Sequence, residues 1–367
     1  MKYPTRKKAT LLLQDGTTFT GHSIGKEGTS GGEICFNTGM TGYQEIYTDP
    51  SYFGQIIVNT TSHIGNYGAL DSEVESDKPT IKGLVVNDFS KIYSRTKATE
   101  SLQEFLERNN TVGIGGVDTR KIVRHIRTKG AMNAIISSEL EGEALQAELD
   151  KIPSMESLEL STKVTTKKAY ELGESNKGFR VAILDLGIKR SILKNLTDRD
   201  CHCKVFPAET TFEEMEKWNP DGYFISNGPG DPAVMDYAST TVAEVIEKNK
   251  PVFGICMGSQ ILAKAVGIPT YKMHHGHRGL NHPVKNLRTG LSEITSQNHG
   301  FAVEMEALSK SDVAELTHID LNHDTVEGLR LKNKPAFAVQ YHPESSPGPN
   351  DSTYLFDDFI QLIKENK

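Results

Sequence analysis

Short apolar runs separated by turn residues dominate the chain before about residue 150. Five of them have the length of strands and end in Gly, Thr, Asn or Asp: ATLLL, EICFN, GQIIVNT, KGLVVND and TVGIGG. One segment differs, because Ile122, Val123 and Ile126 recur at helical spacing between 119 and 129, and Asp118 can cap that helix. This half is therefore predicted to be mixed β and α.

After Phe179 the pattern changes to apolar strands that alternate with amphipathic helices. The strands expected in chain order are RVAILDL, CKVF, GYFISN and PVFGI, and the helices between them contain IKRSILKNL, FEEMEKW and VAEVIEK. This alternation predicts βαβ units, and so an α/β fold with a parallel central sheet and helices on both faces. Residues 271–338 indicate short strands and turns, followed by the strand AFAVQY and a last helix through FDDFIQLI. Ligands of such sheets bind at the carboxyl ends of the strands.

A polar stretch separates the two patterns. Between residues 151 and 178, Ser, Thr, Lys and Glu replace the large apolar side chains. We therefore predict a domain at 1–150, a linker at 151–178 and a second domain at 179–367.

Composition narrows the classes of function. The net charge of −7 argues against nucleic acid as a partner. No apolar run approaches the ~18 to 20 residues of a membrane span, and the first 16 residues lack the apolar core of a signal peptide. Four cysteines, Cys35, Cys201, Cys203 and Cys256, are too few for a disulfide framework in 367 residues. We expect a soluble, cytoplasmic protein without a membrane partner.

Cys256 is the first candidate for chemistry. It lies between the apolar strand PVFGI and the next helix, with Gly254 and Gly258 two residues to either side. This is the pattern of a nucleophile elbow with Cys in place of Ser. A tight turn from strand to helix requires small neighbours, the helix amino terminus stabilises a thiolate, and the N–H of Met257 becomes an oxyanion donor. The alternative is a buried structural cysteine that happens to stand between glycines.

His342 and Glu344 are candidates for the other members of a triad. They follow the strand AFAVQY, and a carboxylate two residues after a histidine can fix the tautomer of its ring while the other nitrogen faces a thiol. The turn SNGPGDP fits a dinucleotide loop by letters, but Pro229 and Pro232 lack the N–H groups that a pyrophosphate would need. We expect its glycines, Gly228 and Gly230, to bring backbone close to a substrate instead.

The motifs SNGPGDP, GICMGSQ and YHPESSPGP together resemble those of the class I, or triad, glutamine amidotransferases. Other segments narrow the resemblance to the small, glutamine-hydrolysing chain of carbamoyl-phosphate synthetase: NTGMTGYQEIYTDPSY, GVDTRKIVRHIRTKGAMNAII, GHRGLNHPV and SQNHGFAV. The resemblance covers nearly the whole chain. It implies a flavodoxin-like amidotransferase domain, preceded by a mixed β/α domain that docks a partner.

The resemblance also implies roles for individual residues. Cys256 would be the nucleophile, His342 the base and Glu344 its orienting partner. The implied glutamine-binding residues are Gly39, Gly228, Gly230, Met257, Gln260, Asn298, Gly300 and Phe301. Two positions depart from the family pattern. Gly39 stands where many members have a serine that contacts glutamine, and Ser259 stands where a larger polar residue such as His is common.

The reaction implied by this family is hydrolysis of glutamine through a γ-glutamyl thioester, with the ammonia passed directly to a large synthetase chain. That partner would make carbamoyl phosphate from bicarbonate and ATP for arginine and pyrimidine synthesis. No G-x-x-x-x-G-K-[ST] loop occurs in this chain. That absence does not exclude other ATP-binding folds, but the resemblance implies no cofactor in this chain, and ATP with a divalent metal on the large chain.

Three further interpretations remain open. A metal-binding protein could use the histidines of MHHGH (273–277), His282 and the sequence Cys201-His202-Cys203, but no second cysteine pair stands at finger spacing. A stand-alone cysteine γ-glutamyl hydrolase would not need the first 150 residues. Arg120, Arg124 and Arg127 lie close together on the predicted helix, either as a solvated basic face or as a docking stripe for an acidic partner.

Overall fold

The computed structural model describes residues 6–174 and 178–367, so residues 175–177 of the predicted linker lie outside the described part. The chain forms two compact units. The first contains residues up to Met155 together with His274–Arg278, and the second contains Glu156–Met273 and Gly279–Lys367. Each unit has its own apolar core.

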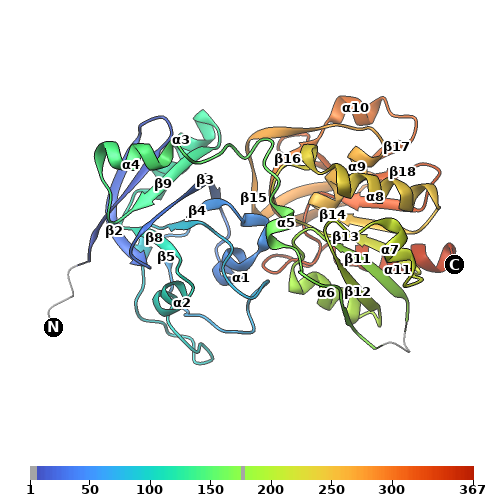
Figure 1. Ribbon diagram of the computed structural model, residues 1–367, viewed down its shortest axis with the longest axis horizontal. Coiled ribbons are helices and arrows are strands. Elements are labelled where there is room, and N and C mark those ends of the chain that lie inside the picture. The colour runs from blue at the N-terminus through green and yellow to red at the C-terminus, as the bar shows by residue number, and fades with distance from the viewer. Residues whose placement is uncertain (1–5, 175–177) are drawn as a thin grey trace. The chain divides into compact units, whose positions relative to one another are not determined.

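The first unit is built on a closed barrel with the strand order β1-β2-β8-β6-β4-β3-β9 (Figure 1). Its strands are β1 (Lys8–Leu13), β2 (Thr18–Gly25), β3 (Thr29–Asn37), β4 (Gln55–Asn59), β6 (Gly83–Val85), β8 (Val112–Gly115) and β9 (Met132–Ser137). Around them lie α1 (Tyr43–Thr48), α2 (Leu102–Arg108), α3 (Thr119–Lys129), α4 (Gly142–Leu149) and the two-stranded sheet of β5 (His63–Ile64) and β7 (Asp88–Phe89). All five predicted apolar runs are strands of the barrel.

The predicted helix 119–129 is confirmed as α3. The carboxylate of Asp118 accepts a hydrogen bond from the backbone N–H of Lys121 at 2.9 Å, as an N-cap residue does. Ile122 and Ile126 are fully buried in a core shared with the barrel strands, and Val123 packs against it. The apolar stripe of α3 therefore faces the barrel and leaves its basic side chains outside.

The second unit contains a ten-stranded sheet with the order β10-β12-β11-β13-β14-β19-β18-β17-β15-β16. Its parallel part consists of β11 (Arg180–Asp185), β12 (His202–Pro207), β13 (Gly222–Ile225), β14 (Val252–Ile255) and β19 (Ala336–Val339). Numbered along the chain, these five strands have the spatial order 2-1-3-4-5, which is that of the flavodoxin-like fold. The predicted α/β class with a parallel central sheet is confirmed.

Helices cover both faces of the parallel strands. Alternate residues of β11 point to opposite faces, so that Val181 and Ile183 belong to one core and Ala182 and Leu184 to the other. The first core also contains side chains of α6 (Arg190–Thr197) and α11 (Tyr354–Glu365), and the second contains those of α7 (Phe212–Glu216), α8 (Asp236–Glu247) and α9 (Met257–Ala265). Figure 1 shows these helices around the strands of the second unit.

The region 271–338 differs from its prediction. In place of short strands alone, it holds the long strands β15 (Thr270–Asn286) and β16 (Ser292–Val303), followed by α10 (Met305–Ser309), β17 (Ala314–Asp320) and β18 (Val326–Leu331). Glycines and polar residues interrupt the apolar pattern of β15, and fewer than half of its side chains are buried. The sequence therefore does not predict one long strand here. The segment 151–178 carries α5 (Ser161–Val164) and β10 (Tyr170–Leu172), which pairs with β12. Among the described residues, no helix is both long and apolar enough to cross a membrane.

Candidate active site

Cys256 occupies a strained turn between β14 and α9. Its backbone has φ 54° and ψ −103°, a conformation that costs a non-glycine residue free energy and is typical of functional turns. The turn is held because the Cys256 N–H donates to the Val339 carbonyl oxygen at 2.9 Å, while its own carbonyl accepts from Ser259 N–H at 3.0 Å. The thiol donates to the backbone oxygen of Asn298 at 3.6 Å. These contacts fix the sulfur at the carboxyl end of the parallel strands.

The glycines beside Cys256 are required by close backbone approaches. A Cβ atom added at Gly254 would lie 2.7 Å from the carbonyl oxygen of Gly258, and one added at Gly258 would lie 2.2 Å from that of Ile225. Backbone atoms cannot move aside as a flexible side chain can. The sequence pattern of small residues around the cysteine therefore has a direct steric cause.

His342 and Glu344 form the second part of the site, just after β19. Nδ1 of His342 and Oε1 of Glu344 are 2.7 Å apart, and both side chains are almost fully buried. The backbone N–H of His342 donates to Ser296 on β16 at 2.8 Å. Within the described residues Nε2 of His342 has no hydrogen-bond partner, so this nitrogen remains available for a proton transfer.

His342 and Glu344 each shift the pKa of the other in the direction that favours its charged form. Burial alone would lower the pKa of His342, but the Glu344 carboxylate and the Cys256 thiol raise it to about 10. Burial would raise the pKa of Glu344, but the Lys189 ammonium and His342 lower it to about 2. A nearby opposite charge thus outweighs desolvation for both groups. The site favours a protonated imidazole beside an ionised carboxylate, which is the state that follows removal of the thiol proton.

Lys189 is a site residue that the sequence analysis missed. Its ammonium lies 2.7 Å from Oε1 of Glu344 and 3.3 Å from the backbone oxygen of Ser345, and the side chain is only 3% exposed. It directly precedes α6, after the carboxyl end of β11. That position was a usable signal, because polar side chains at the carboxyl ends of parallel strands gather at ligand sites. The lysine belongs to no sequence motif that predicts a contact with a carboxylate 155 residues away.

Several predicted glutamine-binding residues lie around the elbow. Gln260, on the first turns of α9, donates from Nε2 to the Phe301 carbonyl at 2.8 Å and to Oε1 of Gln340 at 3.0 Å. Asn298, Gly300 and Phe301 are all on β16, and Asn298 accepts the hydrogen bond of the Cys256 thiol. The structure therefore brings β16 and the start of α9 together at Cys256.

The predicted oxyanion donors also lie at this end of the sheet. Met257 is the first residue of α9, where a backbone N–H has no acceptor within its helix. Gly228 and Gly230 follow β13, the strand that pairs with β14. A Cβ at Gly228 would lie 2.2 Å from the Leu186 carbonyl oxygen, and Gly230 has φ 98°. Neither position accepts a larger residue without a shift of backbone.

Gly39 and Ser259, the two residues that depart from the family pattern, belong to different units. Gly39 belongs to the first unit, where its N–H donates to Asn37 and its carbonyl accepts from Thr61. Ser259 is fully buried in α9, and its hydroxyl has no partner among the described residues. A side chain larger than serine at position 259 would have to fit into this packed interior.

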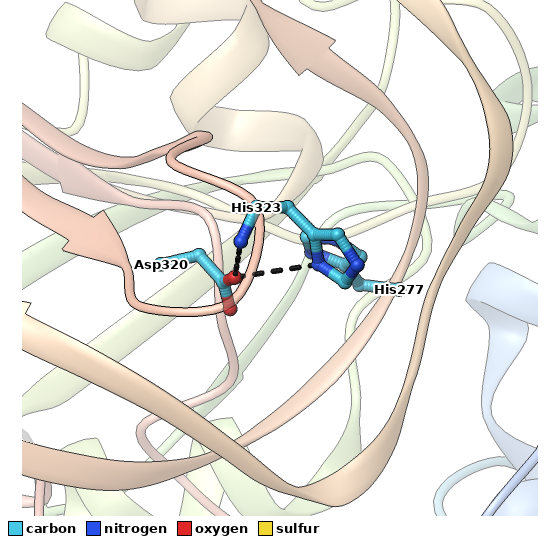
Figure 2. A group of neighbouring side chains, drawn as sticks. All are labelled: His277, Asp320 and His323. Atoms are coloured by element: carbon cyan, nitrogen blue, oxygen red, sulfur yellow. Dashed lines mark hydrogen bonds and ion pairs between the residues drawn. The ribbon is translucent and has the colours of Figure 1, made fainter.

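The groups proposed for a metal are distributed over both units of the chain. His274, His275 and His277 belong to the first unit, and in the described part of the chain they do not by themselves form a three-ligand cluster. Burial raises the pKa of the Cys201 thiol to about 12. Figure 2 shows Asp320, whose carboxylate accepts from the backbone N–H of His323 at 2.8 Å and lies 3.5 Å from the Nδ1 of its ring.

Comparison with known proteins agrees with this arrangement. A family model for class-I glutamine amidotransferases matches residues 182–362. The strained cysteine, the His–Glu pair and the 2-1-3-4-5 sheet thus place the second unit in that class.

A second family model, described as the CPSase domain of the carbamoyl-phosphate synthase small chain, matches residues 11–136. Proteins named carbamoyl phosphate synthase small chain are similar over nearly the full length. The one from Chlorobaculum tepidum is 47% identical over 98% of both chains. That from Aquifex aeolicus is 46% identical over 98% of this chain and all of its own, and that from Vibrio vulnificus is 45% identical over 98% and 99%. The chain belongs to the carbamoyl-phosphate synthase small chain family.

Proposed function

We propose that this chain hydrolyses glutamine and delivers the ammonia to the large chain of a carbamoyl-phosphate synthetase. The observation that carries the proposal is the buried His342–Glu344 contact of 2.7 Å, in the same site as a cysteine held in a strained elbow. Such an arrangement activates a thiol for attack on an amide carbon. The family relationship selects glutamine as the amide.

The proposed reaction has two halves. The Cys256 sulfur attacks the side-chain amide carbon of glutamine, and backbone N–H groups at Met257 and the Gly228–Gly230 turn stabilise the oxyanion. His342, which holds the thiol proton at Nε2, gives it to the departing nitrogen, and ammonia leaves a γ-glutamyl thioester. Water then attacks the thioester while His342 accepts a proton. Return of that proton to the sulfur releases glutamate and restores the thiol.

The partner of this reaction would be the large chain. Ammonia is protonated in neutral water and loses its nucleophilicity, so direct transfer to a synthetase makes the hydrolysis useful. We propose that the large chain binds ATP with a divalent metal and makes carbamoyl phosphate from bicarbonate. The product would serve arginine and pyrimidine synthesis.

We expect Cys256→Ser to abolish glutamate release from glutamine. The matched control is Cys201→Ala, which removes another fully buried thiol at the amino end of β12. Glutamate release is measured for the chain alone and with the large chain, and circular dichroism shows whether each variant is folded. Full activity of folded Cys256→Ser would exclude Cys256 as the nucleophile. Cysteine-dependent release that no large chain increases would indicate a stand-alone hydrolase.

We propose further that the outer face of α3 docks an acidic surface of the large chain. Arg120, Arg124 and Arg127 are exposed, and in the described part of the chain none of the three forms an ion pair. Arg120 and Arg124 border a groove of about 530 Å³ that also includes Lys121 and Lys129 but not Arg127. A cluster of unpaired cations on a chain of net charge −7 favours a partner surface of opposite sign.

Reversing two of these charges tests the docking face. We expect the double variant Arg120→Glu/Arg124→Glu to weaken association with the large chain and to remove the salt dependence of that association. The reason is that charges at the edge of an interface steer the approach of the two partners. The control Lys91→Glu/Lys97→Glu changes the net charge equally at exposed positions of the same unit. Both variants should keep the glutaminase activity of the chain alone. Equal association of the two double variants would exclude α3 as the docking face.

A further inference from the structure

A second cavity, of about 330 Å³, lies in the second unit between the strands β17–β19 and helix α11. Ala336 and Phe337, at the amino end of β19, line it, whereas His342 follows the carboxyl end of the same strand. His342 is five positions after Phe337, which corresponds to about 16 Å of extended chain. The volume is within the range of small-molecule sites. The reaction proposed above uses none of the residues that line this cavity.

His318 supplies a neutral polar group in the wall of the cavity. The residue is 4% exposed, and its Nδ1 lies 3.0 Å from the Thr317 hydroxyl. Its Nε2 is buried and has no hydrogen-bond partner among the described residues. Burial first, and then the charge of Arg288, lowers the pKa of His318 to about 4, so the ring is neutral near pH 7. A buried polar atom without a partner is costly unless a ligand or water satisfies it.

The charged residues of the lining favour an anion. Four cations and two carboxylates line the cavity: Arg288, Arg330, Lys332, Lys334, Asp358 and Glu365. Three of the cations already have partners, because Arg330 pairs with Glu315 at 3.1 Å, Lys332 donates to the Ser311 carbonyl and Lys334 donates to Asn249.

Arg288 is different. Its guanidinium forms no ion pair or hydrogen bond within the described residues, yet its charge lowers the pKa of His318 and acts on that of Asp358. A guanidinium has five N–H donors and binds a carboxylate or phosphate through two parallel hydrogen bonds. It is therefore the group best placed to bind the anion.

The remaining lining is apolar. Leu331, Leu355 and Leu362 contribute aliphatic surface, and the Phe337 ring lines the cavity while it stacks on Phe253 with a centroid distance of 4.5 Å. A flat apolar body would bury this surface from water.

We propose that this cavity binds a small anion with a flat apolar body, namely an aromatic carboxylate or phosphate ester. Arg288 binds the acidic group, Phe337 and the leucines contact the ring, and Nε2 of His318 hydrogen-bonds a polar atom of the ligand. The site belongs to the chain itself and does not depend on the glutaminase reaction.

Calorimetric titration of the full chain with 1-naphthoate and with 1-naphthyl phosphate tests this site, with neutral 1-naphthamide as the comparison. We expect saturable binding of at least one anion, and weaker binding of the amide. Arg288→Ala should lower the affinity for the anion at least about tenfold, because it removes charge-assisted hydrogen bonds. Lys285→Ala removes one exposed positive charge outside the lining and should change little. The tighter of the two anions identifies the acidic group.

A second variant tests the location. Leu362→Trp fills the cavity from α11 and should abolish binding, while glutamate release stays unchanged. The proposal is wrong if neither anion saturates, if the amide binds equally well, or if Arg288→Ala and Lys285→Ala weaken binding by the same factor. Unchanged binding to folded Leu362→Trp would likewise overturn it.

Discussion

At the scale of single residues, the candidate site is a chain of buried charges. Lys189, Glu344 and His342 lie in direct contact, and the side chain of each is at most 3% exposed. Removing one member of such a group leaves an uncompensated charge in a medium of low dielectric constant. Each residue therefore sets the ionisation of the next, and single substitutions should change pH profiles as well as rates.

Substitution of His342 should be more harmful than substitution of Glu344. His342→Asn removes the group that carries the proton, and general acid–base catalysis contributes about 10²–10⁴-fold. Glu344→Gln keeps a hydrogen-bond acceptor for Nδ1 and loses only charge and orientation, so its loss should be smaller. Glutamate release at saturating glutamine measures both variants. The opposite ranking would show that the two roles are assigned wrongly.

Lys189 should act through the ionisation of Glu344. We expect Lys189→Met to raise the pKa of Glu344, because it removes the cation that lowers it. The acid limb of kcat/KM should then move to higher pH, and turnover should fall. Lys194→Met is the matched control, since Lys194 lies on α6 in an exposed pair with Asp198. A lower rate with an unmoved acid limb would mean that Lys189 only supports the fold.

At the scale of elements, the sequence predicted best where local pattern and tertiary structure agree. The apolar runs are strands because each buries a face in the barrel or the parallel sheet, and α3 has both its cap and its apolar stripe. The long strand β15 could not be recognised, because only a minority of its residues are buried. Lys189 was missed for a related reason, since its contact with Glu344 depends on how separate strands are brought together.

Gly258, two residues after Cys256, should be essential for the tight turn between β14 and α9. We expect Gly258→Ala to destabilise the chain by about 1–3 kcal/mol, the range of an overpacked interior, because the new Cβ meets the Ile225 carbonyl oxygen at 2.2 Å. Glutamate release should fall as the turn shifts. Gly290→Ala provides the control, since nothing lies within 4 Å of its Cβ and only its φ of +78° opposes alanine. Urea unfolding compares them, and an equal cost for both would contradict the steric account.

At the scale of the whole molecule, the unfolding of the two units can be measured separately, because each unit has its own core. Trp218 is the only tryptophan of the chain and lies in the second unit, where the Arg180 guanidinium is 4.4 Å from its ring. Its fluorescence therefore reports unfolding of the unit that contains Cys256, His342 and Glu344. Circular dichroism reports both units, so a difference between the two signals separates their transitions.

The buried ion pairs should make the stability of the second unit depend on pH in a defined window. The pKa of Glu344 falls from 4.5 to about 2 on folding, so its contribution is present above pH 4.5 and is lost as the pH falls towards 2. The pKa of His342 rises from 6.5 to about 10, so its contribution is complete below pH 6.5 and is lost as the pH rises towards 10. Both contributions are complete together between about pH 4.5 and 6.5.

Glu344→Gln should therefore reduce the free energy of unfolding most between about pH 4.5 and 6.5. The difference from the unsubstituted chain should narrow towards pH 3 and towards pH 9, where one of the two contributions is already declining. Urea titrations followed by Trp218 fluorescence measure it across this range. Glu306→Gln is the control, because Glu306 and its partner Lys310 are exposed and such pairs stabilise little. A difference that stays constant from pH 3 to 9 would mean that Glu344 stabilises the second unit by packing and not by its charge.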